Sequence, residues 1–340
     1  MKFRNEEELE EVLSAPSEEL IEDLKSMEGD LLFLGVAGKM GMTMAVMAKR
    51  AMQECGKGGK VYGASLFESE KQRKKLEEKG IPTFEGDLMD PGFLQSLPDA
   101  EQVIFLAGQK FGTEGREPFT WAINSYLPGL IAERYKDSRI VVLSTGCVYP
   151  LVPTSTKGSS EKDIPEPVGE YAQSCLGRER LFQYGSVKYK TPVTIVRLYY
   201  SVEMRYGVLV DIATQVLGGT PIDLSMGHAN VIWQGDANNM ILRSLKYCES
   251  PAKILNICGP EIFSVRTVAE EFGRLMGKSP HFTGTENSTA LLGDGRQTYE
   301  LLGMPSVALN QIIEWTAEWM LKGGELLGKP THFEVRDGKY

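Results

Sequence analysis

LLFLGVAGKMG, residues 31–41, is the stretch of this 340-residue sequence that decides the fold. An apolar run is followed by Gly35, Gly38 and Gly41, and a helix-forming stretch then covers residues 42–55. A short apolar run that ends at glycine predicts a buried strand, and glycine permits a tight turn out of it. The stretch therefore predicts a strand, a glycine-rich turn and a helix in direct succession.

Strands and helices alternate beyond this unit. Helical stretches such as residues 68–79 separate further apolar runs, which lie at 60–65, 82–87, 102–108, 139–145, 194–200 and 253–258. Short apolar runs separated by helices are typical of parallel strands buried on both faces. We therefore expect an α/β fold, a doubly wound parallel (Rossmann) sheet with a smaller C-terminal substrate domain.

The glycine-rich turn has the features of a phosphate-binding loop. The first glycine permits the turn, the second lets the backbone approach a pyrophosphate, and the third lets helix and strand pack closely. The N-terminus of the next helix presents free N–H groups and a positive dipole to the phosphates. We expect the pyrophosphate of a dinucleotide to bind at Gly35, Gly38, Lys39, Met40 and Gly41.

The end of the second strand bears on the choice between NAD and NADP. An acidic residue commonly holds the ribose there, whereas this chain has Ser65. Without a carboxylate to repel it, a 2′-phosphate could pair with Lys39, although Lys39 could equally be a solvated lysine. The cofactor is therefore expected to be NAD or NADP.

The sequence pattern divides the chain into three regions. Residues 1–29 are acidic with apolar residues at helical spacing, and they predict an N-terminal helical extension. The alternating pattern assigns 30–200 and about 231–259 to the dinucleotide-binding domain. Residues 201–230 and 260–340, where the alternation is lost, are expected to form the substrate domain.

Composition excludes several classes of function. The net charge of -9 argues against nucleic acid as a main partner, because phosphate backbones require clustered Lys and Arg. The sequence shows no secretory signal and no apolar run long enough to span a membrane. The five scattered cysteines favour reduced thiols over disulfides or a metal site. We expect a cytoplasmic protein without a metal.

Further motifs follow the glycine-rich turn in a fixed order: Asp87-Leu88, Ala107-Gly108, Asn124, STGCVY (144–149) and YAQS (171–174). Together they resemble the extended short-chain dehydrogenase/reductase superfamily, which includes NAD-dependent epimerases and dehydratases of nucleotide sugars. The resemblance implies that Asp87 and Leu88 lie on the adenine side and that Ala107 and Gly108 lie beside the nicotinamide. It also implies a homodimer, since the superfamily frequently forms dimers.

The same resemblance implies the catalytic residues. Thr145 would hydrogen-bond the reacting oxygen. Tyr171 would exchange a proton with a sugar hydroxyl, and it would also contact the nicotinamide cofactor. Tyrosine, with a pKa of about 10, is a poor base at neutral pH unless a cation stabilises the phenolate. The superfamily provides a lysine four residues after the tyrosine, but this chain has Cys175 there, and cysteine cannot supply a cation.

Two other cations are candidates to replace that lysine. Lys110 follows Ala107-Gly108 on a loop that the superfamily's fold brings to the mouth of the site, although loop lysines are often only solvated. Arg178 lies seven residues after Tyr171, two helical turns away, and we expect it to be too far. Lys110 is therefore assigned both a catalytic and a substrate-binding role.

The candidate substrate-binding residues are Lys110, Cys147, Arg205 and His228. Arg205 stands where the superfamily has an arginine at the entrance of the substrate domain, and it suits a carboxylate or phosphate. An Asn and an Arg that the superfamily often has elsewhere in the site are missing, which weakens the case for a nucleotide sugar.

These residues lead to two hypotheses for function. The first is an NAD(P)-dependent epimerase, dehydratase or oxidoreductase acting on a sugar, sugar acid or nucleotide sugar by transient hydride transfer. The alternative is a non-catalytic dinucleotide-binding sensor or scaffold, which the missing lysine would explain.

Overall fold

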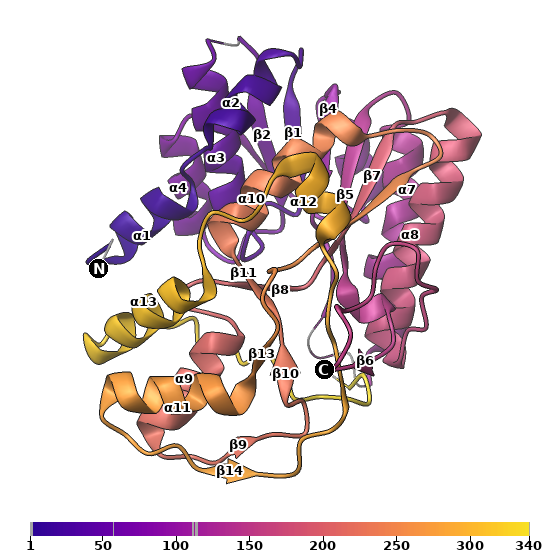
Figure 1. The fold of residues 1–340 in the computed structure, drawn as a ribbon. Helices are drawn as coiled ribbons and strands as arrows, with labels where there is room; N and C mark the ends of the chain where they lie inside the picture. Colours follow the sequence, from indigo (N-terminus) through magenta and orange to yellow (C-terminus); the bar gives the residue numbers. More distant parts are fainter. Residues whose placement is uncertain (1–2, 57, 111, 113–114, 340) are drawn as a thin grey trace.

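A parallel sheet of seven strands forms the centre of the computed structural model, which describes residues 3–56, 58–110, 112 and 115–339 (Figure 1). In spatial order its strands are β3 (Thr83–Glu85), β2 (Val61–Ser65), β1 (Leu31–Leu34), β4 (Gln102–Phe105), β5 (Arg139–Thr145), β7 (Val193–Leu198) and β12 (Lys253–Ile257). The chain starts in the middle of the sheet and winds outward in both directions. The predicted doubly wound fold is confirmed.

Helices cover both faces of this sheet, which explains the continuous apolar runs of its strands. Leu31 and Phe33 of β1 pack towards α2, α3 and α10, whereas Leu32 and Leu34 pack towards α5, α7 and α8. Because successive side chains of a strand point to opposite faces, every position of such a strand is buried. The helices are α2 (Glu18–Lys25), α3 (Gly41–Glu54), α4 (Glu70–Glu78), α5 (Pro91–Ser96), α7 (Leu127–Arg134), α8 (Gly169–Tyr189) and α10 (Gln234–Arg243).

The connection from β4 to α7 and the remaining short elements lie around this core. Helix α6 (Glu117–Trp121) continues through a π-helical turn, η1 (Ala122–Tyr126), into α7. Two 3-10 turns are η2 (Gly146–Val148), which follows β5 directly, and η3 (Ser244–Tyr247), which follows α10.

The smaller domain has its own hydrophobic core, in which α9, α11 and α13 pack together around Phe272 and Trp315. Four pairs of short strands border it: β8 with β11, β9 with β14, β10 with β13, and β6 with β15. The bounds are β6 (Val152–Pro153), β8 (Tyr200–Val202), α9 (Val208–Gly218), β9 (Ile222–Asp223), β10 (His228–Ala229), β11 (Val231–Trp233), β13 (Phe263–Ser264), α11 (Val265–Met276), β14 (Phe282–Thr283), β15 (Thr289–Ala290) and α13 (Leu309–Leu321).

The N-terminal extension connects the two domains. It forms α1 (Glu6–Leu13) and α2, capped by the side chains of Asn5 and Ser17. Apolar residues of α1 enter the core of the smaller domain, whereas those of α2 pack on α3 and α10 of the larger one. The extension therefore stabilises one particular placement of the two domains.

One helix differs from the sequence-based domain division. Helix α12 (Arg296–Leu302) lies within the segment expected to belong to the substrate domain. Its Gln297 and Thr298 side chains instead donate to the backbone carbonyls of Ile254 and Asn256 in β12, at 3.1 and 2.7 Å. A seven-residue helix that docks on an edge strand leaves no sign of its partner in the sequence, so the pattern alone could not place it.

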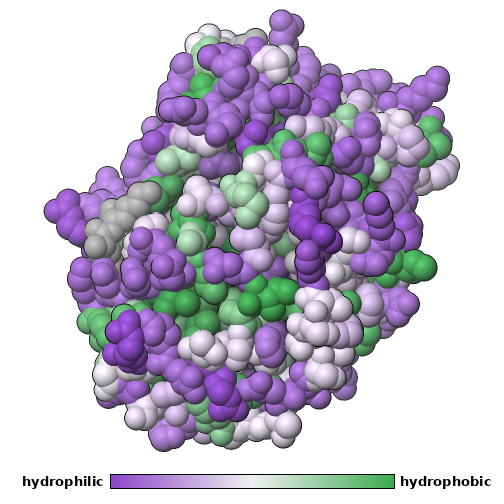
Figure 2. Space-filling model, viewed as in Figure 1, coloured by the Kyte–Doolittle hydropathy of each residue, from purple (hydrophilic) through white to green (hydrophobic). Residues whose placement is uncertain are grey.

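Hydrophilic residues cover most of the face shown in Figure 2, and a band of hydrophobic residues crosses its lower half, over the smaller domain. Within the described ranges, no helix has the length and apolar character that crossing a membrane requires.

Candidate active site

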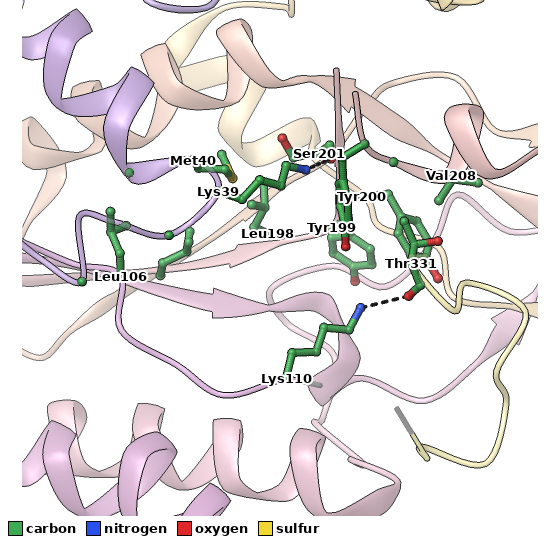
Figure 3. Close-up of a pocket in the computed structure, with 16 residues that line it drawn as sticks. Lys39, Met40, Leu106, Lys110, Leu198, Tyr199, Tyr200, Ser201, Val208 and Thr331 are labelled. Atoms are coloured by element: carbon green, nitrogen blue, oxygen red, sulfur yellow. Dashed lines mark hydrogen bonds between the residues drawn. The ribbon is translucent and has the colours of Figure 1, made fainter. Parts of the chain in front are cut away.

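A pocket of about 300 Å³ opens where the carboxyl ends of the central strands face the smaller domain (Figure 3). The glycine-rich turn after β1 and Lys110 after β4 form one side of it. Tyr199, Tyr200 and Tyr206, which follow β7 and enter the smaller domain, form the other. Ligands of open α/β sheets bind at this edge of the sheet.

The three glycines of the turn have different roles. Gly35 has a φ of +88°, and a Cβ there would lie 2.6 Å from the backbone nitrogen of Ala107. A Cβ on Gly41 would lie 2.3 Å from the carbonyl oxygen of Val36. A Cβ on Gly38 would meet only the Gly35 carbonyl oxygen, at 3.5 Å, and would otherwise occupy open space. Gly35 and Gly41 therefore serve the fold, while Gly38 leaves room for a ligand.

This open space suits the diphosphate of a dinucleotide. Helix α3 begins beside it, and Met40 at its N-cap position provides no side-chain hydrogen bond to the first N–H groups. Such N–H groups and the helix dipole favour a phosphate. The turn therefore fits the cofactor that the sequence predicted.

We predict that Gly38→Val abolishes NAD binding without unfolding the protein. The valine side chain would fill the space above the turn, which the protein itself does not use. Calorimetric titration with NAD measures the loss, and the melting temperature of the variant should stay close to that of the wild type. Unchanged NAD affinity in Gly38→Val would contradict a diphosphate site at this turn.

The contacts of Lys39 bear on the 2′-phosphate prediction. Its Nζ atom donates to the carbonyl oxygen of Ser201 at 3.0 Å and lies 3.8 Å from the ring centre of Tyr206. Both partners belong to the segment that enters the smaller domain, whereas Ser65 ends β2 and does not line this pocket. The side chain of Lys39 thus extends towards the substrate domain, and its contact with a 2′-phosphate stays a prediction.

The other residues predicted to bind cofactor lie at strand ends on the same edge of the sheet. Ser65 ends β2, and Ala107 and Gly108 follow β4. After β3, the Asp87 carboxylate accepts a hydrogen bond from the Met89 backbone N–H at 2.9 Å, and Leu88 is buried. Their contacts with adenine, ribose and nicotinamide stay predictions.

Tyr171 and Thr145 are brought together by two different elements. Thr145 ends β5 and Tyr171 lies in the first turn of α8, close enough for Thr145 to act on the pKa of Tyr171. Burial, with the neighbouring Cys175 and Cys147, raises the pKa of Tyr171 well above its usual value. Burial likewise raises the pKa of Cys175 to about 11, so this side chain is a neutral thiol. Tyr171 is therefore held in its protonated form in the protein without ligand.

Arg178 reaches this site, contrary to the expectation that it lies too far away. Its guanidinium donates to the Leu143 carbonyl at 2.7 Å and to the Asn124 side chain at 2.8 Å. A Cβ on Gly108 would lie 2.6 Å from its Nη2 atom. The charge of Arg178 acts against the burial that raises the pKa of Tyr171. Counting helical turns between backbone positions missed this because a long arginine side chain extends back along its helix.

Lys110, which follows β4, lines the pocket, whereas Tyr171, Thr145 and Arg178 lie outside its lining. Its Nζ donates to the Thr331 carbonyl oxygen at 3.4 Å (Figure 3). Cys147 and Cys175 are close enough to act on its pKa. Burial lowers the pKa of Lys110. Cys147 is half-buried and follows Thr145, whose hydroxyl accepts from its backbone N–H at 3.1 Å. Roles of both residues in holding substrate stay predictions.

Two residues predicted to bind substrate lie outside the lining of this pocket. The Arg205 guanidinium pairs with Glu203 at 3.1 Å and with Glu6 and Glu10 of α1 at 3.0 and 3.2 Å. His228 lies in β10, opposite Ser264 of β13. The N-terminal helix neutralises Arg205, and His228 belongs to a strand pair of the smaller domain. Roles of both residues in binding substrate stay predictions.

Sequence reasoning also missed the C-terminal segment. Thr331 lines the pocket, and its backbone N–H and hydroxyl donate to the Asp211 carboxylate of α9 at 2.8 and 2.5 Å. Residues 322–339 contain no helix or strand and no motif. The sequence therefore carried no signal that this segment returns to the site.

Comparison with solved structures shows close likeness of fold at low identity. A complex titled MoeE5 with UDP-glucose and NAD is 19% identical, with a TM-score of 0.69, covering 87% of this chain and 99% of that chain. UDP-glucuronic acid 4-epimerase from Bacillus cereus with NAD is 19% identical, with a TM-score of 0.69 over 86% of this chain and 98% of that chain. UDP-glucose 4-epimerase from Thermotoga maritima is 17% identical, with a TM-score of 0.72 over 86% and 99%.

A search of curated proteins found no match. A family match covers residues 32–202, from β1 to the end of β8, and so includes the glycine-rich turn, Thr145 and Tyr171. This half of the chain carries both the predicted cofactor site and the predicted catalytic pair. The chain belongs to the NAD dependent epimerase/dehydratase family.

Proposed function

We propose that this protein is an NAD-dependent epimerase or dehydratase of a sugar, with Tyr171 as its acid/base. The observation that carries the proposal is the placement of Thr145, at the end of β5, next to Tyr171, at the start of α8, on the sheet edge that also holds the glycine-rich turn. Family membership points to NAD as the cofactor and favours an enzyme over the sensor alternative.

The proposed roles follow from the positions of the side chains. NAD, when bound, supplies a hydride acceptor that returns the hydride later. Thr145 orients the reacting hydroxyl by a hydrogen bond, and Tyr171 moves its proton. Arg178, assisted by Lys110, provides the positive charge that the missing lysine would have supplied, because a nearby cation favours the phenolate.

The substrate is proposed to be a sugar or nucleotide sugar. The similar structures named above include proteins bound to UDP-glucose or named for UDP-glucuronic acid. These proteins resemble this chain in fold. Because they are bound to or named for UDP-sugars, a UDP-sugar is the first class of substrate to test. The five cysteines are free, which supports the proposed cytoplasmic location.

The proposal is tested by incubating the NAD-loaded protein with a panel of UDP-sugars and free sugars and following products by NMR. We expect conversion of at least one sugar to its epimer or its dehydrated product. NAD binding without conversion of any member of a broad panel would contradict the enzymatic proposal.

We predict that kcat, measured at saturating substrate, rises with pH across the neutral range. A base must lose its own proton first, and the raised pKa of Tyr171 leaves only a small phenolate fraction at neutral pH. That fraction increases as pH rises towards the pKa. A lysine at position 175 would lower the pKa of Tyr171, so Cys175→Lys should shift the pH–rate profile to lower pH. Cys175→Ser is the neutral control, and a profile that falls with pH above neutrality would contradict this role of Tyr171.

We propose a homodimer formed through α8 and η1. These elements expose Tyr126, Leu181, Tyr184 and Val187, with 60%, 37%, 62% and 61% of their surfaces accessible. Exposed apolar residues gathered on adjacent elements mark association surfaces. Tyr184→Glu should convert a dimer to a monomer in light scattering, whereas the same change at the exposed Leu327 should not. A wild-type monomer at micromolar concentration would contradict the proposal.

A further inference from the structure

Two lysines from different loops converge on the pocket. Lys39 comes from the glycine-rich turn and Lys110 from the loop after β4, and both line the cavity together with Tyr200 and Tyr206 (Figure 3). The charge of Lys110 acts directly on Lys39. Two ammonium groups facing one cavity both attract an anion that enters between them.

The surroundings of Lys39 strengthen this conclusion. Its side chain is accessible within the pocket, yet the protein around it removes enough water to lower the pKa of Lys39 to about 7. Its direct contacts are a carbonyl oxygen and a tyrosine ring, neither of which carries a negative charge. Glu203, the acid with the largest effect on it, is already bonded to Arg205 through three hydrogen bonds.

The second lysine has a similar environment. The acids that act on Lys110 are Asp211 and Glu334. Asp211 already accepts two hydrogen bonds from Thr331. The charged or titratable groups that act on the pair are Glu203, Arg205, Asp211, Glu334, Cys147 and Cys175.

We propose that Lys39 and Lys110 form a binding site for an anionic group of the substrate, a carboxylate or a phosphate. The inference rests on the proposed function, since it concerns the substrate of that site. Charge-assisted hydrogen bonds from ammonium groups hold such groups strongly. The substrate is therefore an acidic or phosphorylated sugar rather than a neutral one.

The diphosphate of NAD is not the anion that these lysines hold. The turn itself and the start of α3 provide backbone N–H groups for that diphosphate. Lys39 extends from the turn to Ser201, at the first strand of the smaller domain, and Lys110 extends to Thr331. Both amines thus lie on the substrate side of the pocket.

Calorimetric titration of the NAD-loaded protein tests the site. The probes are glucuronate, UDP and glucose, which present a carboxylate, a diphosphate and no charge. Wild type should bind glucuronate or UDP and bind glucose more weakly, and the tighter of the two anions identifies the source of the charge. Lys39→Met and Lys110→Met should each weaken binding of that anion by about 10- to 100-fold, the effect of losing one charge-assisted hydrogen bond.

The pH dependence provides a second readout. Lys39 with a pKa of about 7 is charged below this pH and neutral above it. Glucuronate stays charged across this range, so its binding should weaken as pH rises through 7. Lys39→Arg should keep the binding at higher pH, because guanidinium stays charged.

Two controls separate this inference from the proposed function. Lys278→Met, at an exposed position beyond α11, should bind like the wild type. NAD affinity should be unchanged in both pocket variants, and an equal loss of NAD affinity would show that the lysines serve the cofactor and overturn the inference. Anion binding that survives in both Met variants would overturn it too. If wild type bound no NAD, the proposed function would fail, and the same anion titrations without NAD would still decide the lysine site.

Discussion

Tyr171→Phe is expected to lower turnover by about 10²- to 10⁴-fold, the usual contribution of a positioned acid/base. Phenylalanine keeps the ring and removes only the hydroxyl, whose pKa Thr145 influences. The effect should appear in kcat on the first substrate that the sugar panel identifies, while NAD affinity and melting temperature stay near wild type. Tyr62 of β2 is half-buried and lies on a strand away from Tyr171 and Thr145, so Tyr62→Phe serves as the matched control.

Thr145 provides a second check on the same pair. Thr145→Val keeps the shape of the side chain and removes the hydroxyl, and it should also lower kcat. A Tyr171→Phe variant with wild-type turnover would show that the proton is moved by another group.

Arg197→Met is expected to destabilise the protein by about 3–5 kcal/mol, the range found when one partner of a buried ion pair is removed. Arg197 of β7 and Glu179 of α8 are 1% and 0% exposed and lie 2.6 Å apart. Ser144 also donates to Glu179, at 2.6 Å. Removing Arg197 would leave the Glu179 charge buried with only the serine hydroxyl to compensate it. Denaturant unfolding measures the change.

This ion pair also matters for the site. Glu179 lies on the helix that carries Tyr171, and Ser144 immediately precedes Thr145. The network therefore fixes α8 against β5 and sets the distance between the catalytic side chains. Arg266→Met, which breaks the more exposed pair with Glu286, is the control and should cost no more than about 1 kcal/mol. A loss in Arg197→Met as small as that of the control would contradict the account of the network.

The sequence was sufficient for the fold because the pattern of buried strands is local. Residues 31–34 and 140–143 are apolar at every position, as a sheet covered on both faces requires, and the structure has strands there. The glycine-rich turn could also be predicted from the sequence, because backbone geometry requires glycine at particular positions of such a turn. The family match confirms the class of protein that these motifs predicted.

The sequence could not predict which partners the long basic side chains reach. Lys39, Arg178 and Arg205 were each placed by the position of their backbone, and each guanidinium or amine reaches a partner far along the chain. Arg205 meets α1, about 200 residues earlier in the sequence. Such contacts depend on the packing of domains and extensions, which no local pattern encodes.

The most direct test of the central claim is a titration of the NAD-loaded protein with acidic UDP-sugars, read by the absorbance of reduced nicotinamide and by NMR of the sugar. The account predicts that a sugar is converted, with a rise in this absorbance, in the wild type and not in Tyr171→Phe. Tight binding of NAD and sugar with neither absorbance change nor conversion would contradict it.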